Sequence, residues 1–134
     1  MKRNLDFKML SLNVRSIRSF DKRKALFNWI AKERSDIIFL QETYCTPEVE
    51  NIWKSQWRGS VFFSRGSQHS RGVIILLKEN FNCEVNMHRE DEQERFLILK
   101  AVIQGQSFVL VTIYAPNKIK DQCTFFEEIH KQLD

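Results

Sequence analysis

Ile37-Ile38-Phe39-Leu40 is a continuous apolar run that leads directly into Gln41-Glu42-Thr43. A short run of this kind is typical of a strand that is buried on both faces of a sheet. The segment Phe7–Asn13 predicts an earlier strand, and the residues between the two have the spacing of a helix capped by Ser19 or Asp21. The order strand, helix, strand favours a parallel crossover unit and hence an α/β fold.

The helix between these strands is predicted to present one apolar stripe to the sheet. Leu26, Trp29 and Ile30 recur at the i, i+3, i+4 spacing, with Ala25 beside them. We expect this helix to end near Arg34.

The second half of the chain predicts several strands in succession, with a hairpin turn at Gln104-Gly105-Gln106. Helical spacing returns from Lys118, where Phe125, Phe126, Ile129 and Leu133 form a stripe. No Pro/Gly/Ser-rich break divides the chain, so we expect one mixed sheet with flanking helices. The strands are predicted over residues 61–63, 73–77, 82–87, 96–103 and 108–114.

One of these strands is apolar at nearly every position. Residues 96–103 read Phe-Leu-Ile-Leu-Lys-Ala-Val-Ile, which predicts cover on both faces of the sheet. The predicted helices are too few to provide it. We therefore expect an apolar sheet face that something else must cover.

Composition sets broad limits on the class of protein. The chain has 134 residues, enough for one domain or part of one, and four glycines argue against a Gly-rich phosphate loop. Three widely spaced cysteines indicate neither a disulfide framework nor a zinc site. With no secretory leader and no apolar run long enough for a membrane span, we expect a soluble protein of the nucleus or cytoplasm.

Charge is unevenly distributed along the chain. Residues 1–34 carry ten Lys/Arg and three Asp/Glu, a balance of +7, against +4 for the whole chain. A basic end of this kind suits a polyanion such as nucleic acid, and it also suits a solvated surface.

Glu42 and Asn13 are the first candidate site residues, because each lies where a predicted parallel strand ends. The carboxyl ends of neighbouring parallel strands meet at one edge of a sheet, which is where such folds collect catalytic groups. A carboxylate is the ligand type that Mg²⁺ prefers, and the Asn13 amide is suited to orienting that ligand or donating to a phosphate. Asn13 is equally compatible with a turn.

Tyr114 and Asn117 flank the proline-stiffened exit of another strand. A phenol can donate to a nonbridging phosphate oxygen and an amide can hold a loop or substrate, although packing on an edge strand is the commoner role of a tyrosine. The polar segment 64–71 contributes Arg65 and Arg71 to a basic loop that we expect at the same rim.

Three motifs together resemble the endonuclease/exonuclease/phosphatase superfamily, which includes deoxyribonuclease I and the apurinic endonucleases. They are Ser11-Leu12-Asn13-Val14, Leu40-Gln41-Glu42-Thr43 and Ile113-Tyr114-Ala115-Pro116-Asn117, in the family's order. Within the superfamily, Gln-Glu-Thr and Arg71-Gly72-Val73 are most similar to the endonuclease domain of LINE-type retrotransposons. Arg15 departs from the apurinic pattern, which has an acid there.

The resemblance implies a Mg²⁺-dependent nuclease acting on DNA, with Mn²⁺ as an alternative cofactor. It implies that Glu42 binds the metal, that Asn13 supports the metal site and that Tyr114 contacts the scissile phosphate. Asn117 joins this catalytic set, and Arg15, Arg65 and Arg71 are candidate substrate-binding residues. The family's Gly-Asp-Phe-Asn and Ser-Asp-His motifs have no counterpart here.

Residues 1–134 therefore resemble a partial domain, the N-terminal half of a two-sheet α/β sandwich of the deoxyribonuclease I type. We expect the isolated chain to be inactive and to meet either its missing half or a second copy through the exposed apolar face. Two alternatives stay open: a noncatalytic remnant or module that binds nucleic acid or a partner, and a phosphoesterase of the same superfamily with another substrate.

Overall fold

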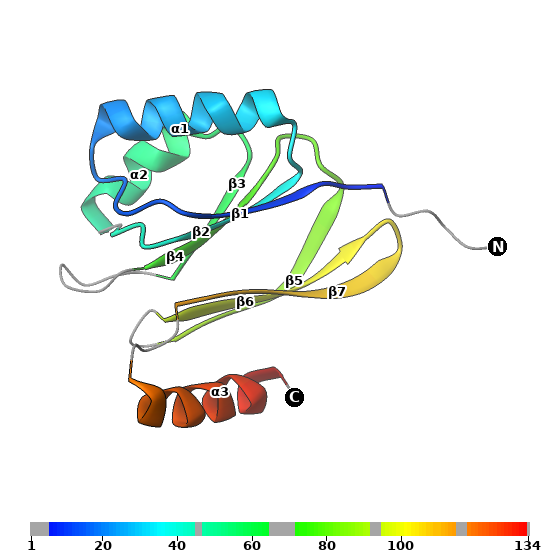
Figure 1. Cartoon of the computed structure of the whole chain (residues 1–134). Helices are drawn as coiled ribbons and strands as arrows, with labels where there is room; N and C mark the ends of the chain where they lie inside the picture. The colour runs from blue at the N-terminus through cyan, green and yellow to red at the C-terminus, as the bar shows by residue number, and fades with distance from the viewer. Residues whose placement is uncertain (1–5, 45–46, 65–71, 92–94, 115–117, 134) are drawn as a thin grey trace.

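The computed structural model describes residues 6–44, 47–64, 72–91, 95–114 and 118–133. It has two stacked sheets, with two helices outside the first sheet and one outside the second (Figure 1). The α/β class and the two-sheet sandwich implied by the resemblance are confirmed. The expectation that this chain forms one mixed sheet is wrong, because the later strands separate into a sheet of their own.

The first sheet has the order β1-β2-β4-β3. β1 and β2 are parallel, which confirms the crossover unit, and β4 is antiparallel to both β2 and β3. Its elements and the two helices that cover it are β1 (Met9–Asn13), α1 (Phe20–Glu33), β2 (Ile37–Gln41), α2 (Pro47–Gln56), β3 (Ser60–Ser64) and β4 (Val73–Leu77).

The second sheet is an antiparallel meander of order β5-β6-β7, as the succession of strands predicts. Its strands are β5 (Cys83–Glu90), β6 (Phe96–Ile103) and β7 (Gln106–Ile113), and α3 (Ile119–Leu133) follows them. Alternate residues of β6 face opposite layers. Leu97 and Leu99 pack against the first sheet, whereas Phe96 and Ile98 pack against α3.

The apolar face predicted to be exposed is buried between the two sheets. Ile37, Val73 and Ile75 of the first sheet pack there against Leu97 and Leu99 of the second, and all five are fully buried. Cover comes from this chain's own second sheet. The face between the two sheets is therefore not available for self-association, whereas Val109 on the outer side of β7 is 49% exposed.

The helix α1 is capped as predicted, because the Ser19 side chain accepts a hydrogen bond from the backbone of Lys22. Its buried side differs from the predicted stripe. Phe27 and Ile30 are buried, but Trp29 is 45% exposed. The stripe is displaced because α1 packs against α2 as well as the sheet, with the Phe27 ring 6.0 Å from that of Trp53.

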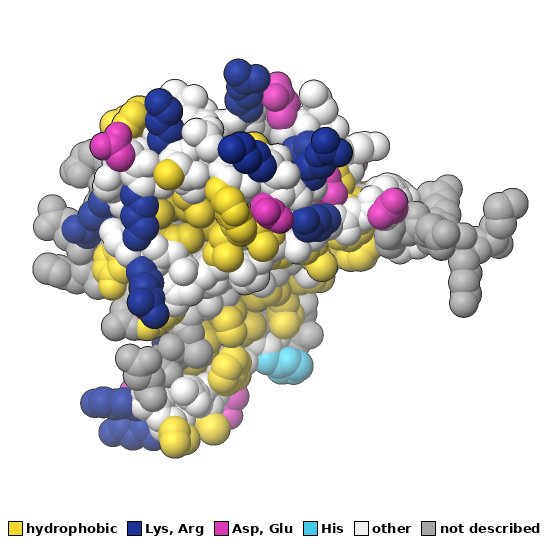
Figure 2. Space-filling view, turned by 45° about the horizontal axis from the view of Figure 1, so that its top comes forward, with side chains coloured by type: hydrophobic (Ala, Val, Ile, Leu, Met, Phe, Trp, Pro, Cys, Tyr) yellow, Lys and Arg dark blue, Asp and Glu magenta, His cyan; other side chains and the backbone are white. Residues whose placement is uncertain are grey.

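The outer face of α1, together with Lys8 just before β1, carries many of the basic residues. Figure 2 shows Lys and Arg side chains over this surface with hydrophobic side chains exposed among them. Arg23 is an exception, since it is only 2% exposed and donates to Gln56 Oε1 and to two backbone carbonyls. Arg23 therefore joins α1 to α2 and adds nothing to the exposed positive charge.

Candidate active site at the ends of three strands

The candidate site forms where β1 and β2 end side by side. Asn13 is the register partner of Gln41, so the two strands finish at the same level. The chain after β1 then pairs with the chain after β2: the Ser16 amide donates to the Glu42 carbonyl at 2.6 Å, and the Ile17 amide donates to the Thr43 carbonyl at 3.2 Å. Glu42 is thereby held beside the segment that follows Asn13.

These two loops contain a cluster of left-handed residues. Arg15, Ser16, Glu42 and Tyr44 have φ angles of 49°, 72°, 54° and 54°. None is glycine, and such conformations are uncommon for residues with a Cβ. Strained backbone of this kind tends to collect at functional sites, where the surrounding structure imposes it.

Gly72 anchors the Glu42 loop to the start of β4. Its carbonyl accepts a hydrogen bond from the Thr43 amide at 3.3 Å, and its own φ is 60°. A Cβ at this position would lie 2.8 Å from Thr43 Oγ1, closer than real contacts allow. Glycine is therefore required both for the backbone conformation and for the close approach.

A cleft of about 490 Å³ opens between the two sheets at this edge. Across it, the Gln41 side chain donates to Ser11 Oγ at 3.2 Å and to Thr112 Oγ1 at 3.0 Å. This amide bridges β1, β2 and β7, and so joins the first sheet to the second. The cleft is lined by Ser11, Asn13, Phe39, Gln41, Val111, Thr112, Ile113 and Tyr114.

Tyr114 reaches the cleft from the end of β7. Its backbone amide donates to the Arg95 carbonyl at 2.6 Å. Arg95 is itself held by Asp91, with Nε 2.6 Å from Oδ2, and its guanidinium lies over the Phe125 ring. The exit of β7 is therefore tied to the adjacent strands before Tyr114 enters the cleft.

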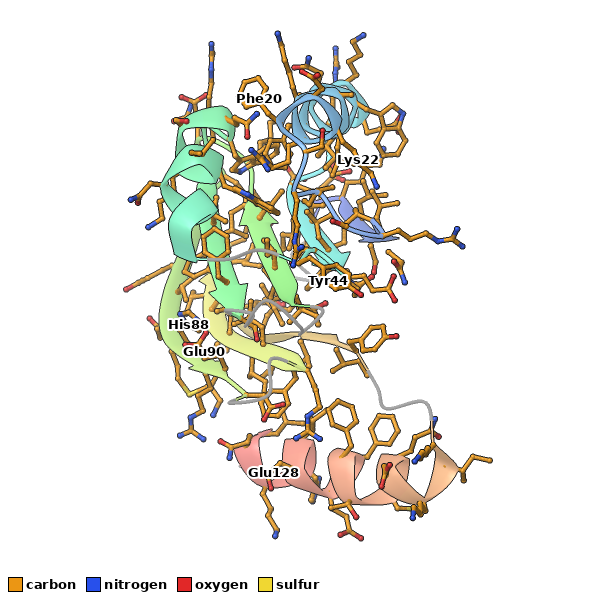
Figure 3. All side chains as sticks on the ribbon, turned by 90° about the vertical axis from the view of Figure 1, so that its left-hand side faces the viewer. Phe20, Lys22, Tyr44, His88, Glu90 and Glu128 are labelled. Carbon is orange, nitrogen blue, oxygen red and sulfur yellow. The ribbon has the colours of Figure 1, made fainter. Side chains whose placement is uncertain are left out.

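Asn13 makes the local turn with which its sequence position is also compatible. Its side-chain oxygen accepts a hydrogen bond from the Arg15 amide at 3.2 Å, and the Arg15 side chain is exposed to solvent. Arg18 lies on the same loop, donates to the Tyr44 carbonyl and stacks over the Tyr44 ring. Figure 3 views this end of the molecule and labels Tyr44.

The structure thus brings part of the predicted set together. Asn13 and Tyr114 line one cleft, and Glu42 directly follows Gln41 in the same cleft. Glu42 itself is half-buried and is not among the lining residues. Asn117, Arg65 and Arg71 lie outside the described residues.

Sequence reasoning missed the Gln41 bridge to Ser11 and Thr112. Gln41 was visible within the Leu-Gln-Glu-Thr motif, but nothing in the pattern distinguishes an amide that crosses between sheets from one that points into solvent. Thr112 is 3% exposed, and its signal was only a polar residue in an otherwise apolar strand.

The donors at this site fit a hard cation in type but not in number. Glu42 supplies a carboxylate and Asn13 an amide, which are oxygen ligands of the kind Mg²⁺ accepts. Among the residues that the structure describes, no group of three or more His, Cys, Asp or Glu is placed to hold a metal ion.

A membrane span needs a helix of sufficient length and hydropathy. Within the described residues, no helix is long and apolar enough to span a membrane.

Comparisons with known proteins agree with the fold and the motifs. The Transposon TX1 uncharacterized 149 kDa protein of Xenopus laevis is 29% identical over 124 residues, covering 92% of this chain and 10% of that protein. The DNA repair nuclease APEX1 of Danio rerio is 30% identical, covering 86% of this chain and 38% of that protein. This chain therefore spans well under two thirds of either relative.

Among solved structures, TDP2 of D. rerio humanized by 14 mutations has a TM-score of 0.68 at 19% identity, covering 91% of this chain and 58% of that one. At this identity the likeness shows the shared fold. The family model described as Endonuclease/Exonuclease/phosphatase family matches residues 10–111, which is most of the sequence. The chain belongs to the endonuclease/exonuclease/phosphatase family.

Proposed function

We propose that this chain is the first part of the catalytic domain of a divalent-metal-dependent endonuclease of the retrotransposon type, which hydrolyses DNA phosphodiester bonds. The observation that carries the proposal is the meeting of three strand ends: Asn13 and Tyr114 line one cleft, bridged by the residue that precedes Glu42. The transposon relative supports the retrotransposon origin, and the relative named as a DNA repair nuclease supports the nuclease activity.

In this proposal each residue has a separate task. The Glu42 carboxylate holds Mg²⁺ or Mn²⁺, which when bound neutralises phosphate charge and lowers the pKa of a water nucleophile. Asn13 keeps the loop after β1 in register with Glu42, and the Tyr114 phenol donates to a nonbridging phosphate oxygen. Asn117, Arg15, Arg65 and Arg71 remain proposed contacts to loop, phosphate or substrate.

A single carboxylate cannot complete such a site, so we further propose that residues 1–134 act within a longer protein. The short share of each relative that the chain covers supports this. A general base and a general acid each contribute roughly 10²-fold or more to such a reaction. The chain by itself is therefore expected to be inactive.

The test uses the longest natural product that contains this chain and measures nicking of supercoiled plasmid with Mg²⁺ and with EDTA. Glu42→Gln should slow nicking roughly 10²-fold, and Tyr114→Phe roughly tenfold, because each loses a contact to the reacting phosphate or its counter-ion. Glu127→Gln, on the exposed side of α3, is the matched control and should leave the rate unchanged. Equal rates for Glu42→Gln and Glu127→Gln would refute the assigned role of Glu42.

A second candidate is a noncatalytic module that binds nucleic acid through the basic face of α1. It is favoured by the exposed Lys8, Arg15, Lys22, Lys24 and Lys32 on and before this helix. Binding that persists in EDTA and weakens steeply with salt, with no nicking by the longest product, would support this candidate over the first. Release of inorganic phosphate without nicking would instead point to another phosphoester substrate.

A further inference from the structure

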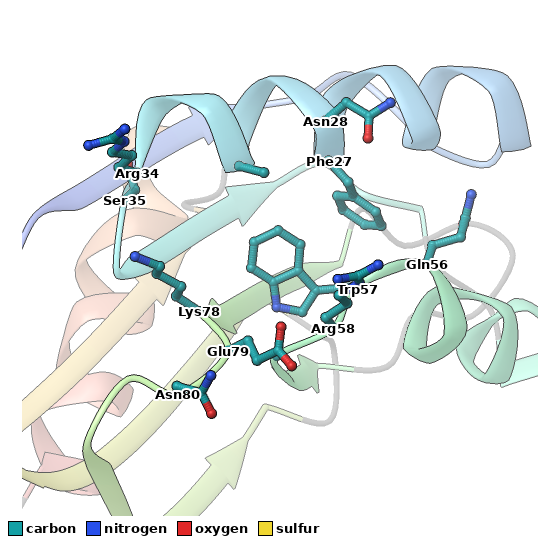
Figure 4. A pocket seen from close by; sticks show the side chains of 12 residues that line it. Phe27, Asn28, Arg34, Ser35, Gln56, Trp57, Arg58, Lys78, Glu79 and Asn80 are labelled. Atoms are coloured by element: carbon teal, nitrogen blue, oxygen red, sulfur yellow. The ribbon is translucent and has the colours of Figure 1, made fainter.

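A second cavity lies at the opposite end of the first sheet from the candidate active site. It has a volume of about 530 Å³, within the range of small-molecule sites. Its walls come from the last turns of α1 and α2, the turn before β3 and the end of β4 (Figure 4). The strand ends that carry Asn13 and Glu42 are at the other edge, so the two sites are separate.

One wall of this cavity is apolar and rigid. Phe27 projects from α1 toward the indole of Trp57 (Figure 4), with ring centroids 5.6 Å apart. The indole is fixed further by its Nε1–H, which donates to the Leu77 carbonyl at 3.0 Å. Phe27 and Trp57 are 5% and 7% exposed, and Ala31 adds a small, exposed side chain on the same helix.

Two polar side chains that line the cavity have buried atoms without a partner among the described residues. They are the Ser35 hydroxyl, on a residue only 3% exposed, and the Gln56 amide nitrogen. Gln56 is oriented by its other terminal atom, which accepts from Arg23 at 2.7 Å. Buried polar atoms are costly when unpaired, so a ligand that pairs with them is favoured.

The rim of the cavity is positively charged. Arg34, Arg58 and Lys78 line it and are exposed, against the single carboxylate of Glu79. Guanidinium and ammonium groups placed this way suit a phosphate ester. An aromatic wall, buried hydrogen-bonding atoms and a cationic rim are the three features of a site for a base, its polar edge and its phosphate.

We propose that this cavity binds a free nucleoside monophosphate, with the base against Phe27 and Trp57, its polar edge toward Ser35, and the phosphate at Arg58 and Lys78. The inference does not depend on the proposed nuclease activity. A ligand here would bind at a distance from the cleft, on the helices that cover the first sheet.

The experiment is isothermal titration of the chain with AMP, adenosine and inorganic phosphate as separate probes. AMP should bind at least about tenfold more tightly than either fragment, because only AMP engages both wall and rim. Arg58→Gln and Lys78→Gln should each weaken AMP binding by about tenfold, through loss of a charge-assisted hydrogen bond. Lys131→Gln on α3 is the charge-matched control.

A second pair of variants tests the cavity itself. Ala31→Trp fills the space beside Phe27 and should abolish AMP binding, whereas Ala25→Trp, exposed elsewhere on α1, should not. Circular dichroism of all variants is the check that each is folded. The proposal would be overturned if AMP failed to bind, if AMP bound no more tightly than inorganic phosphate, or if Ala31→Trp and Ala25→Trp had equal effects on AMP binding. A short 5′-phosphorylated oligonucleotide that binds more tightly than AMP would also overturn it, in favour of a strand end.

Discussion

The two sheets use left-handed backbone in different ways. In the second sheet, Gln104 and Gly105 have φ angles of 52° and 79° and form the two-residue turn between β6 and β7. A tight hairpin favours positive φ at both positions, so this geometry has an ordinary cause. In the first sheet, four non-glycine residues adopt positive φ in the loops after β1 and β2, where no hairpin requires it.

This difference between the two sheets shows where tertiary contacts impose strain on the backbone. Left-handed backbone costs about 1–3 kcal/mol for each residue with a Cβ and persists only where neighbouring contacts over-determine it. Those contacts are present: the amides of Ser16 and Ile17 donate to the carbonyls of Glu42 and Thr43. The loops after β1 and β2 therefore hold each other in place through these hydrogen bonds. The second sheet contributes the regular end of β7 to the site.

The largest expected effect concerns the outer layer of the second sheet, which α3 covers. Phe125 is 1% exposed and packs on Phe96, so Phe125→Ala should lower the free energy of unfolding by about 3–5 kcal/mol. Urea unfolding followed by circular dichroism measures it. Phe126 is 48% exposed, and Phe126→Ala should cost less than about 1 kcal/mol. Equal losses would mean that α3 does not pack as described.

The next effect separates the strained loops from the regular hairpin. Gly72→Ala should cost about 1–3 kcal/mol, because it adds both an unfavourable φ and a contact with Thr43. Gly105→Ala, in the hairpin, should cost about 1 kcal/mol from φ alone. Thermal or urea unfolding of both variants gives the comparison.

A double variant isolates the contact. In Thr43→Ala/Gly72→Ala the hydroxyl that a Cβ at residue 72 would meet is gone, so part of the Gly72→Ala cost should disappear. If the two changes add without relief, the cost lies in the backbone and the close approach is not the reason for glycine.

Much of this fold can be predicted from pattern alone. The run over residues 37–40 is a buried strand, the crossover is parallel, and the apolar residues 96–103 are covered on both sides, because burial leaves a direct trace in the sequence. The sequence does not show which element packs against a buried face of a strand. Residues 73–77 and 96–103 look alike, yet they lie in different sheets, and so one sheet was predicted where there are two.

The candidate site was predictable to the level of strand ends and no further. Asn13 and Tyr114 line one cleft because their strands end at the same edge of the molecule, and their positions after separate strands predicted that they would converge. The Gln41 bridge, the left-handed loops and the displaced stripe of α1 depend on tertiary contacts. Trp29 illustrates the limit, since helical spacing placed it toward the sheet and contact with α2 turned α1 so that Phe27 is buried instead.

A smaller effect is expected where the two sheets are joined at the cleft. Thr112→Val keeps the shape of a buried side chain and removes the acceptor of the Gln41 amide, at a cost of about 1 kcal/mol. Thr124→Val on the exposed side of α3 should change stability by less than about 0.5 kcal/mol. If Thr112→Val changes stability as little as Thr124→Val does, the hydrogen bond does not hold the sheets together and solvent competes for the Gln41 amide.

The smallest effect distinguishes the inner layer from the outer layer through thiol chemistry. Cys83 begins β5 and packs against the core between the sheets, and burial raises the pKa of its thiol, whereas Cys123 is exposed on α3. The thiolate is the reactive form, and a raised pKa lowers its fraction at any pH below that pKa. Cys83 should therefore react with iodoacetamide more slowly than Cys123, and the ratio of the two rates should narrow as pH rises through the pKa of Cys83, as peptide mass spectrometry can measure. Unfolding in urea should remove the difference, because burial is its cause; if the difference persisted in urea, local sequence rather than the inter-sheet core would control the reactivity of Cys83.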